Sequence, residues 1–211
     1  MKFIADSMLG DVARWLRMLG YDTLYSRSIK DHEILRIAER DDRVILTRDI
    51  SLVRRARKRG LRAILIDSTE IVDVLTKISL KTGIEVKFKE KETRCPYCNT
   101  LLVIITKAEA LSFVPPSVGA KYNKFWKCPR CGKIYWQGNH WRTINEIIER
   151  AGISFRVYKN TLIFSTMGEE SLRKTAEHIR EKLALEEMSK DPSFLRTLSD
   201  NQKKELENKR R

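Results

Sequence analysis

Three short apolar segments in the first third of the chain each close on an aspartate, in the runs KFIAD (2–6), RVILTRD (43–49) and RAILID (62–67). The stretches between them carry apolar residues at helical spacing. Residues 1–90 therefore predict alternating strands and helices, and hence a parallel sheet. The carboxyl ends of parallel strands meet at one edge of a sheet, where ligands of α/β proteins usually bind. We expect the three aspartates to converge at that edge.

A further source of carboxylates is the helix predicted to begin at Asp31, which also carries Glu33 in its first turn. Helix capping alone would account for Asp31. Carboxylates gathered in one crevice repel one another, and a divalent cation relieves that repulsion. Hard oxygen ligands suit Mg²⁺ or Mn²⁺, so we predict one or two such ions and a reaction on phosphates. The candidate catalytic residues are Asp6, Asp31, Glu33, Asp49 and Asp67, with Asp6 and Asp49 as the metal ligands.

The formal net charge of +14 predicts an acidic partner, either nucleic acid or, as an alternative, a membrane surface. No apolar run approaches the length of a membrane span, and the N-terminal MKFIAD has no signal-peptide core. We therefore expect a cytoplasmic protein that does not enter the membrane. Its cysteines should be reduced, because cytoplasmic thiols rarely form disulfides.

The four cysteines form two CxxC turns, Cys95-Pro-Tyr-Cys98 and Cys128-Pro-Arg-Cys131, with 29 residues between them. Two such turns supply the four thiolates of a tetrahedral zinc site. Because a closed four-cysteine site has no open coordination position, we expect one structural zinc and no zinc catalysis. The alternative is four buried thiols without a metal. The long spacing predicts an ordered insertion over residues 104–121.

Residues 93–140 carry seven basic residues and a single acid, Glu109, and aromatic residues are interleaved with the basic ones. Such a surface can stack on unpaired bases and hold phosphates, although a small zinc ribbon also needs aromatics as its core. A basic helix predicted over residues 50–59 is a second candidate. The predicted nucleic-acid contacts are Arg14, Arg17, Arg48, Arg54, Arg55, Lys58, Lys124, Trp126, Lys127, Arg130, Trp136, His140 and Trp141.

The C-terminal part is predicted from pattern alone. A helix is expected over residues 141–151, then a β-hairpin over 154–166, a long helix over 169–189 and a basic tail that ends at Arg211. We expect three parts: an α/β domain (1–90), a zinc ribbon (91–145), and a hairpin and helix extension with the basic tail (146–211).

Three blocks of sequence carry a family resemblance: FIADSMLGDVARWLRMLGYDTLY, DHEILRIAERDDRVILTRD and CPYC…CPRCGKIYWQGNHW. Over residues 1–145 the chain resembles the Mut7-C RNase family, PIN-like proteins that carry a zinc ribbon. The resemblance implies a PIN-like α/β/α fold and a ribonuclease site with four acids and Mg²⁺ or Mn²⁺. By position, Asp6 ends the first strand, Asp31 or Glu33 comes from the second helix, Asp49 follows a Thr-Arg pair, and Asp67 is the candidate for the fourth acid.

Other functions are weighed against this one. The chain could be an RNA- or ribosome-binding protein on a PIN-like scaffold, with little or no cleavage. A DNA substrate stays open, because phosphate contacts carry no information on the sugar. Phosphotransfer is disfavoured: a receiver domain would show an acidic pair after the first strand, where this chain has Asp6-Ser7, and a haloacid dehalogenase would show DxDxT. The oligomeric state is not predicted.

Overall fold

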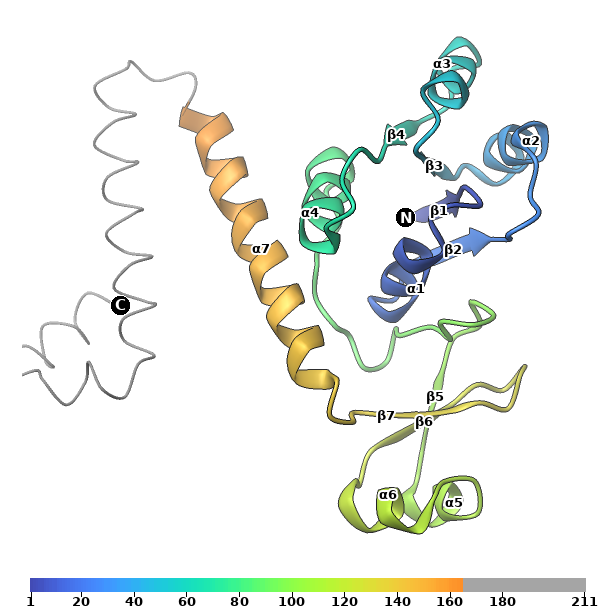
Figure 1. The fold of residues 1–211 in the computed structure, drawn as a ribbon, viewed down its shortest axis with the longest axis vertical. Coiled ribbons are helices and arrows are strands. Elements are labelled where there is room, and N and C mark those ends of the chain that lie inside the picture. Colours follow the sequence, from blue (N-terminus) through green and yellow to red (C-terminus); the bar gives the residue numbers. More distant parts are fainter. Residues whose placement is uncertain (165–211) are drawn as a thin grey trace, which may run out of the picture. The chain divides into compact units, whose positions relative to one another are not determined.

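Four parallel strands in the order β2-β1-β3-β4 form the central sheet of the N-terminal domain (Figure 1). The computed structural model describes residues 1–164, and the side chains of residues 1–154. The strands are β1 (Lys2–Ala5), β2 (Asp22–Tyr25), β3 (Val44–Thr47) and β4 (Ala63–Leu65). All three strand pairs are parallel, so the predicted parallel α/β domain is confirmed.

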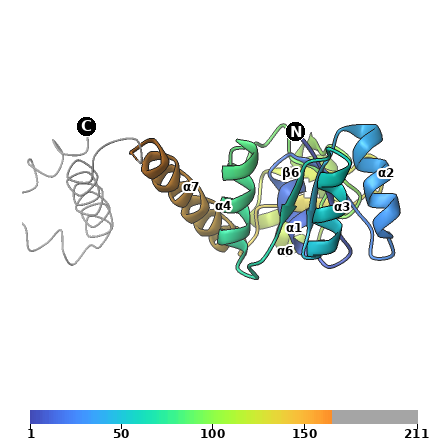
Figure 2. The same cartoon turned by 90° about the horizontal axis from the view of Figure 1, so that it is seen from above.

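Helices cover both faces of this sheet, which makes three layers. Phe3 and Leu46 pack on α1 and α4, whereas Ile4 and Ile45 pack on α2 and α3. This alternation buries both faces of the central strands, as expected for a parallel sheet. Figure 2 shows α2 and α3 side by side. The helix bounds are α1 Gly10–Met18, α2 Asp31–Asp41, α3 Ile50–Lys58 and α4 Ile71–Thr82.

A separate three-stranded antiparallel sheet follows, in the order β5-β6-β7. We call this sheet and its two cysteine turns the ribbon. The predicted insertion is ordered and contains two short helices; Ala110 of the first helix and Val114, between the two, pack against Phe125 of the ribbon. Residues 84–88, which resemble a strand in the sequence, form none. The elements are β5 Val103–Ile105, α5 Lys107–Leu111, α6 Pro116–Lys121, β6 Phe125–Lys127 and β7 Ile134–Trp136.

The ribbon is fastened to the α/β domain through Arg17, a helix residue only 4% exposed. Its guanidinium donates to the carbonyl of Thr23 at 2.9 Å and to the carbonyls of Pro96 and Tyr97 at 2.8 and 3.2 Å. Arg17 thus joins α1, β2 and the first cysteine turn. The sequence predicts Arg17 as a phosphate contact. Its guanidinium is already occupied by these carbonyls, so Arg17 is not available to bind RNA.

Asn99 closes the open edge of β2. Its side-chain oxygen accepts from the amide of Thr23 at 3.0 Å, and its side-chain nitrogen donates to Asp22 at 2.7 Å. Asn99 has a φ of 68°, a left-handed conformation that asparagine tolerates better than most residues. An unpaired strand edge is a template for aggregation, and this contact covers it with the ribbon.

The last described element is α7, which runs from Trp141 to Phe164. The β-hairpin predicted over 154–166 is therefore wrong for residues 154–164, which continue the helix. The alternating run SFRVY fits a strand as well as a helix, and periodicity cannot separate the two in so short a run. Extending a helix already formed adds one hydrogen bond per residue, whereas a hairpin must start anew. The helix predicted over 169–189 and the basic tail lie outside the described residues.

The joint at Arg17 predicts a large loss of stability when it is broken. Arg17→Ala should lower the free energy of unfolding by roughly 3 kcal/mol, because it leaves buried carbonyls without donors. Arg14→Ala is the matched control, since Arg14 lies one turn away in an exposed pair with Asp11 and should change stability by less than about 1 kcal/mol. Denaturant unfolding of the full chain measures both. Equal losses for the two variants would contradict the role given to Arg17.

Candidate active site and metal centre

The four cysteines meet in one cluster whose ligand atoms all lie within 4.8 Å of one another. The Sγ atoms of Cys95 and Cys131 are 3.6 Å apart, and those of Cys98 and Cys128 are 3.4 Å apart. Four sulfurs bound to one zinc at about 2.3 Å would be separated by about 3.8 Å, close to this spacing. The arrangement suggests a structural zinc, as the sequence predicts.

Both cysteine turns have the same backbone form. The amides of Asn99 and Gly132 donate to the carbonyls of Cys95 and Cys128, each at 2.9 Å, and both residues have positive φ. Burial raises the pKa of the Cys128 thiol to about 12. At Cys98 burial also raises the pKa, but hydrogen bonds, chiefly with Thr100, outweigh it and lower the pKa to about 6. Burial and local hydrogen bonds therefore shift the pKa values of these two thiols in opposite directions.

Asp6 and Asp49 follow the adjacent strands β1 and β3, and hydrogen bonds through Thr47 link the Asp6 carboxylate to the backbone of Asp49. Asp6 is 8% exposed and accepts hydrogen bonds from the Thr47 hydroxyl at 2.7 Å and from Ser7 at 3.0 Å. The Thr47 oxygen in turn accepts from the amide of Asp49 at 2.9 Å. Asp49 caps α3 by accepting from the amide of Ser51 at 2.7 Å. Thr47 thus links the ends of the two strands.

Asp31 reaches the same place from α2. The terminal nitrogen Nη2 of Arg55, on α3, contacts Asp31 Oδ2 and lies 3.8 Å from Asp49 Oδ2. One guanidinium therefore serves two carboxylates from different elements. Their side chains are 42% and 44% exposed, so solvent still reaches both. The structure brings Asp6, Asp31 and Asp49 to one end of the sheet.

Glu33 and Asp67 each have a local partner instead. Glu33 accepts from the amide of Lys30 at 3.0 Å in a capping box, and this bond lowers the pKa of its carboxyl. Asp67 pairs with Lys77 at 2.6 Å, which lowers the pKa of Asp67 in the same way. Among the residues that the structure describes, only the cysteines form a group of three or more ligands close enough to share an ion.

Comparison with protein families identifies the N-terminal two thirds of the chain. Residues 1–148 match the Mut7-C RNase domain. The chain belongs to the Mut7-C RNase domain family. The match spans the parallel sheet, the ribbon and the start of α7, and an RNase family implies a nucleic-acid substrate. Comparisons with curated proteins and with solved structures each gave no match. The described helices include none that is both long and apolar enough to cross a membrane.

The Mut7-C domain has a cavity of about 360 Å³ between the beginnings of α1 and α4. Arg48 lines it together with Trp15 and Glu70. One terminal nitrogen of Arg48 donates to the carbonyl of Ser68 at 3.2 Å, while its buried Nε has no hydrogen-bond partner among the described residues. The sequence predicts Arg48 as a phosphate contact but gives no sign of the cavity, because its walls come from segments far apart in the chain.

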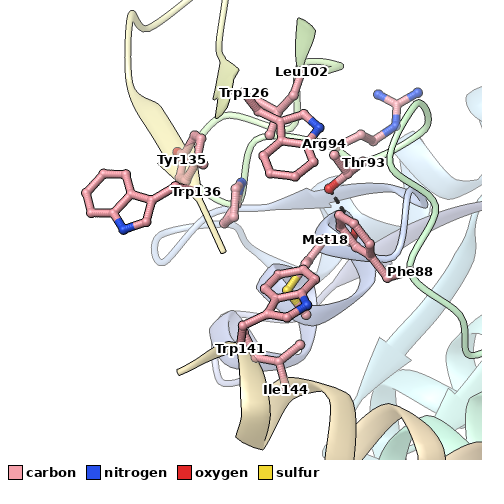
Figure 3. A pocket seen from close by; sticks show the side chains of 11 residues that line it. Met18, Phe88, Thr93, Arg94, Leu102, Trp126, Tyr135, Trp136, Trp141 and Ile144 are labelled. Carbon is pink, nitrogen blue, oxygen red and sulfur yellow. Dashed lines mark hydrogen bonds between the residues drawn. The ribbon is translucent and has the colours of Figure 1, made fainter. Parts of the chain in front are cut away.

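The other predicted nucleic-acid contacts differ in their surroundings. Arg54, Lys58, Arg130 and His140 are exposed. Several of the remaining side chains already have partners: Arg14 pairs with Asp11, Lys124 pairs with Glu90, and Lys127 lies over the Phe113 ring. Trp126 is buried, and Figure 3 shows it with Trp136 and Trp141 among the aromatic residues that line a cavity beside the ribbon.

The cysteine geometry predicts one zinc per chain. Cys98→Ser should lose most of that zinc, and its midpoint of thermal unfolding should fall by roughly 5 °C or more, because the metal holds both turns in place. Asp49→Asn, which leaves the cysteines intact, should keep its zinc. Elemental analysis and thermal unfolding of the full chain measure the two effects. A wild-type protein without zinc after purification in zinc-containing buffer would rule out the structural site.

Proposed function

We propose that this Mut7-C protein is a cytoplasmic endoribonuclease that depends on Mg²⁺ or Mn²⁺ and grips RNA with its zinc-bearing ribbon. The observation that carries the proposal is the meeting of Asp6, Asp31 and Asp49 at the carboxyl end of the parallel sheet, in a domain of an RNase family. Glu33 and Asp67 stay predictions as additional catalytic acids. In this structure each of them contacts a local partner instead.

The donor set fits a hard divalent cation, since all three side chains offer carboxylate oxygens. Arg55 lies next to both Asp31 and Asp49. Neighbouring carboxylates repel one another unless positive charge lies between them, so this contact also supports a cation site. Bound there, Mg²⁺ or Mn²⁺ would stabilise charge on the scissile phosphate and lower the pKa of an attacking water. Arg55 would then be available to a phosphate of the RNA.

The chain's own residues would do the positioning. Thr47 and Ser7 donate to Asp6 and fix the direction of its carboxylate, while capping of α3 fixes Asp49. Carboxylates whose positions are already fixed lose little conformational entropy when they bind a metal ion. Arg48 and the exposed basic side chains of α3 would hold phosphates on either side of the cut. RNA binding should therefore weaken steeply with salt, since each phosphate contact releases counterions.

A second candidate function is RNA or ribosome binding with little or no cleavage. One observation favours it: Asp31 and Asp49 are engaged with Arg55, and among the described residues the acids do not form a group of three ligands that is already assembled. In that case Arg55 would be the permanent counter-ion of the acids. The choice between RNA and DNA stays open on phosphate contacts alone.

Cleavage of a mixed-structure RNA with Mn²⁺ separates the two functions. Asp49→Asn should slow cleavage by roughly 100-fold or more, because it removes a carboxylate charge that the metal needs. Asparagine still caps α3, so the fold and the affinity for RNA should hold. Asp42→Asn is the matched control: Asp42 is exposed, pairs with Arg62 and has a left-handed φ of 49° that asparagine accepts.

Gel-resolved time courses and RNA affinity are measured for all three proteins. Full cleavage by Asp49→Asn would contradict the proposed site. RNA binding by the wild type without cleavage under Mg²⁺ or Mn²⁺ would leave the binding function as the correct one.

A further inference from the structure

Two adjoining cavities lie beside the ribbon, at the start of α7, far along the chain from the carboxylates. The first has a volume of about 230 Å³ and the second about 270 Å³. Tyr135, Trp136, Trp141 and Ile144 line both. Each cavity is smaller than the roughly 300 Å³ at which pockets begin to hold drug-sized ligands, so each suits one small flat group.

The walls of the first cavity are aromatic and firmly held. Phe88 meets Trp126 and Trp141 edge to face, with ring centroids 6.0 and 4.6 Å apart. Trp126 donates its indole N–H to the carbonyl of Glu90 at 3.0 Å. The Tyr135 hydroxyl lies 3.0 Å from Cys95 Sγ, which ties this wall to the cysteine cluster. Figure 3 shows the rings of Phe88, Trp126 and Trp141 around one space.

Trp136 and Trp141 are only half-buried, so part of each ring is open to the cavities. A ring that is already ordered can stack on a ligand at little cost in conformational entropy. Stacking on an aromatic side chain tolerates any of the bases, because every base has a π-face. The geometry therefore favours a flat aromatic group, and any of the bases would fit this description.

The charge of the segment that contributes these walls indicates the class of that ligand. Residues 93–140 carry seven basic side chains against Glu109. Arg94 borders the first cavity, where its guanidinium donates to the carbonyls of Gly20 and Asn99, and the exposed His140 borders the second. A basic side chain, Arg94, beside aromatic walls on a segment of net positive charge matches the phosphates and bases of a polynucleotide. An apolar peptide segment would satisfy the walls but offer no negative charge to Arg94.

We propose that the two cavities receive neighbouring unpaired bases of an RNA strand, so that the ribbon selects single-stranded over double-stranded substrate. The inference rests on the proposed RNA binding by the ribbon and adds the kind of RNA that is bound. Paired bases are stacked within the duplex and cannot enter such cavities without being unpaired, which costs free energy.

The test measures binding by fluorescence anisotropy, with the full chain carrying Asp49→Asn, no added divalent metal and no chelator. Three labelled probes of equal length are compared: a single-stranded RNA, its duplex, and an abasic ribose-phosphate strand. Trp136→Ala should weaken binding of the single strand roughly tenfold or more while leaving the duplex and the abasic strand unchanged. Trp136→Phe should restore most of the affinity, because it returns a ring.

Two further variants guard against a trivial result. Ile144→Phe fills space shared by both cavities without opening a hole in the core, and it should weaken single-strand binding in the same selective way. Phe113→Ala removes an aromatic side chain that is 59% exposed, lies between the two cysteine turns in the sequence and lines neither cavity. This variant should bind the probes as the Asp49→Asn protein does. Zinc content and circular dichroism establish that each variant is folded.

The outcomes separate this inference from the proposed nuclease. Binding that does not distinguish the single strand from the abasic strand, or equal losses of single-strand and duplex affinity in Trp136→Ala, would overturn the base cavities alone. A folded protein that binds none of the probes would overturn RNA binding by the ribbon as well. Neither result depends on whether the carboxylates cut RNA, because Asp49→Asn and the absence of divalent metal remove cleavage from the measurement.

Discussion

The negative charge collected at the end of the parallel sheet is the constraint on which the site depends. Asp6, Asp31 and Asp49 come from three different elements, and the fold alone brings them together. Hydrogen bonds through Thr47 and a shared contact with Arg55 keep them there. Neighbouring carboxylates repel one another, and positive charge between them relieves that repulsion. The guanidinium of Arg55 supplies positive charge in this structure. We propose that a divalent cation supplies it during the reaction.

The ribbon depends on a different kind of interaction, a buried set of hydrogen bonds to backbone carbonyls. Arg17 donates to β2 and to the first cysteine turn, and Asn99 pairs with the free edge of β2. The first cysteine turn is thereby fixed to the sheet as well as to the second turn. The aromatic wall that includes Tyr135 rests on the cysteine cluster in turn. Loss of the cluster is therefore expected to disturb the cavities as well as the ribbon.

Local patterns in the sequence predicted most of the fold. Apolar runs and CxxC turns are short-range signals, and they gave the parallel sheet, the ribbon and the cysteine cluster. The hairpin over 154–166 failed because an alternating run such as SFRVY suits either periodicity, and the preceding helix decided it. Among the acids, nothing local shows that Lys77 would engage Asp67. The cavities escaped prediction because their walls, from Phe88 to Ile144, meet only in the folded chain. The bounds of the three parts remain predictions.

The most direct test of the account is a crystal of the full chain soaked in Mn²⁺, with anomalous scattering used to locate the ion. The zinc expected at the cysteines can be located at its own absorption edge and serves as an internal control. We predict a manganese peak within about 2.2 Å of oxygens from both Asp6 and Asp49, with Arg55 displaced from the carboxylates. Anomalous signal at the cysteines alone, with Arg55 still bound to Asp31 and Asp49, would contradict the proposed metal site.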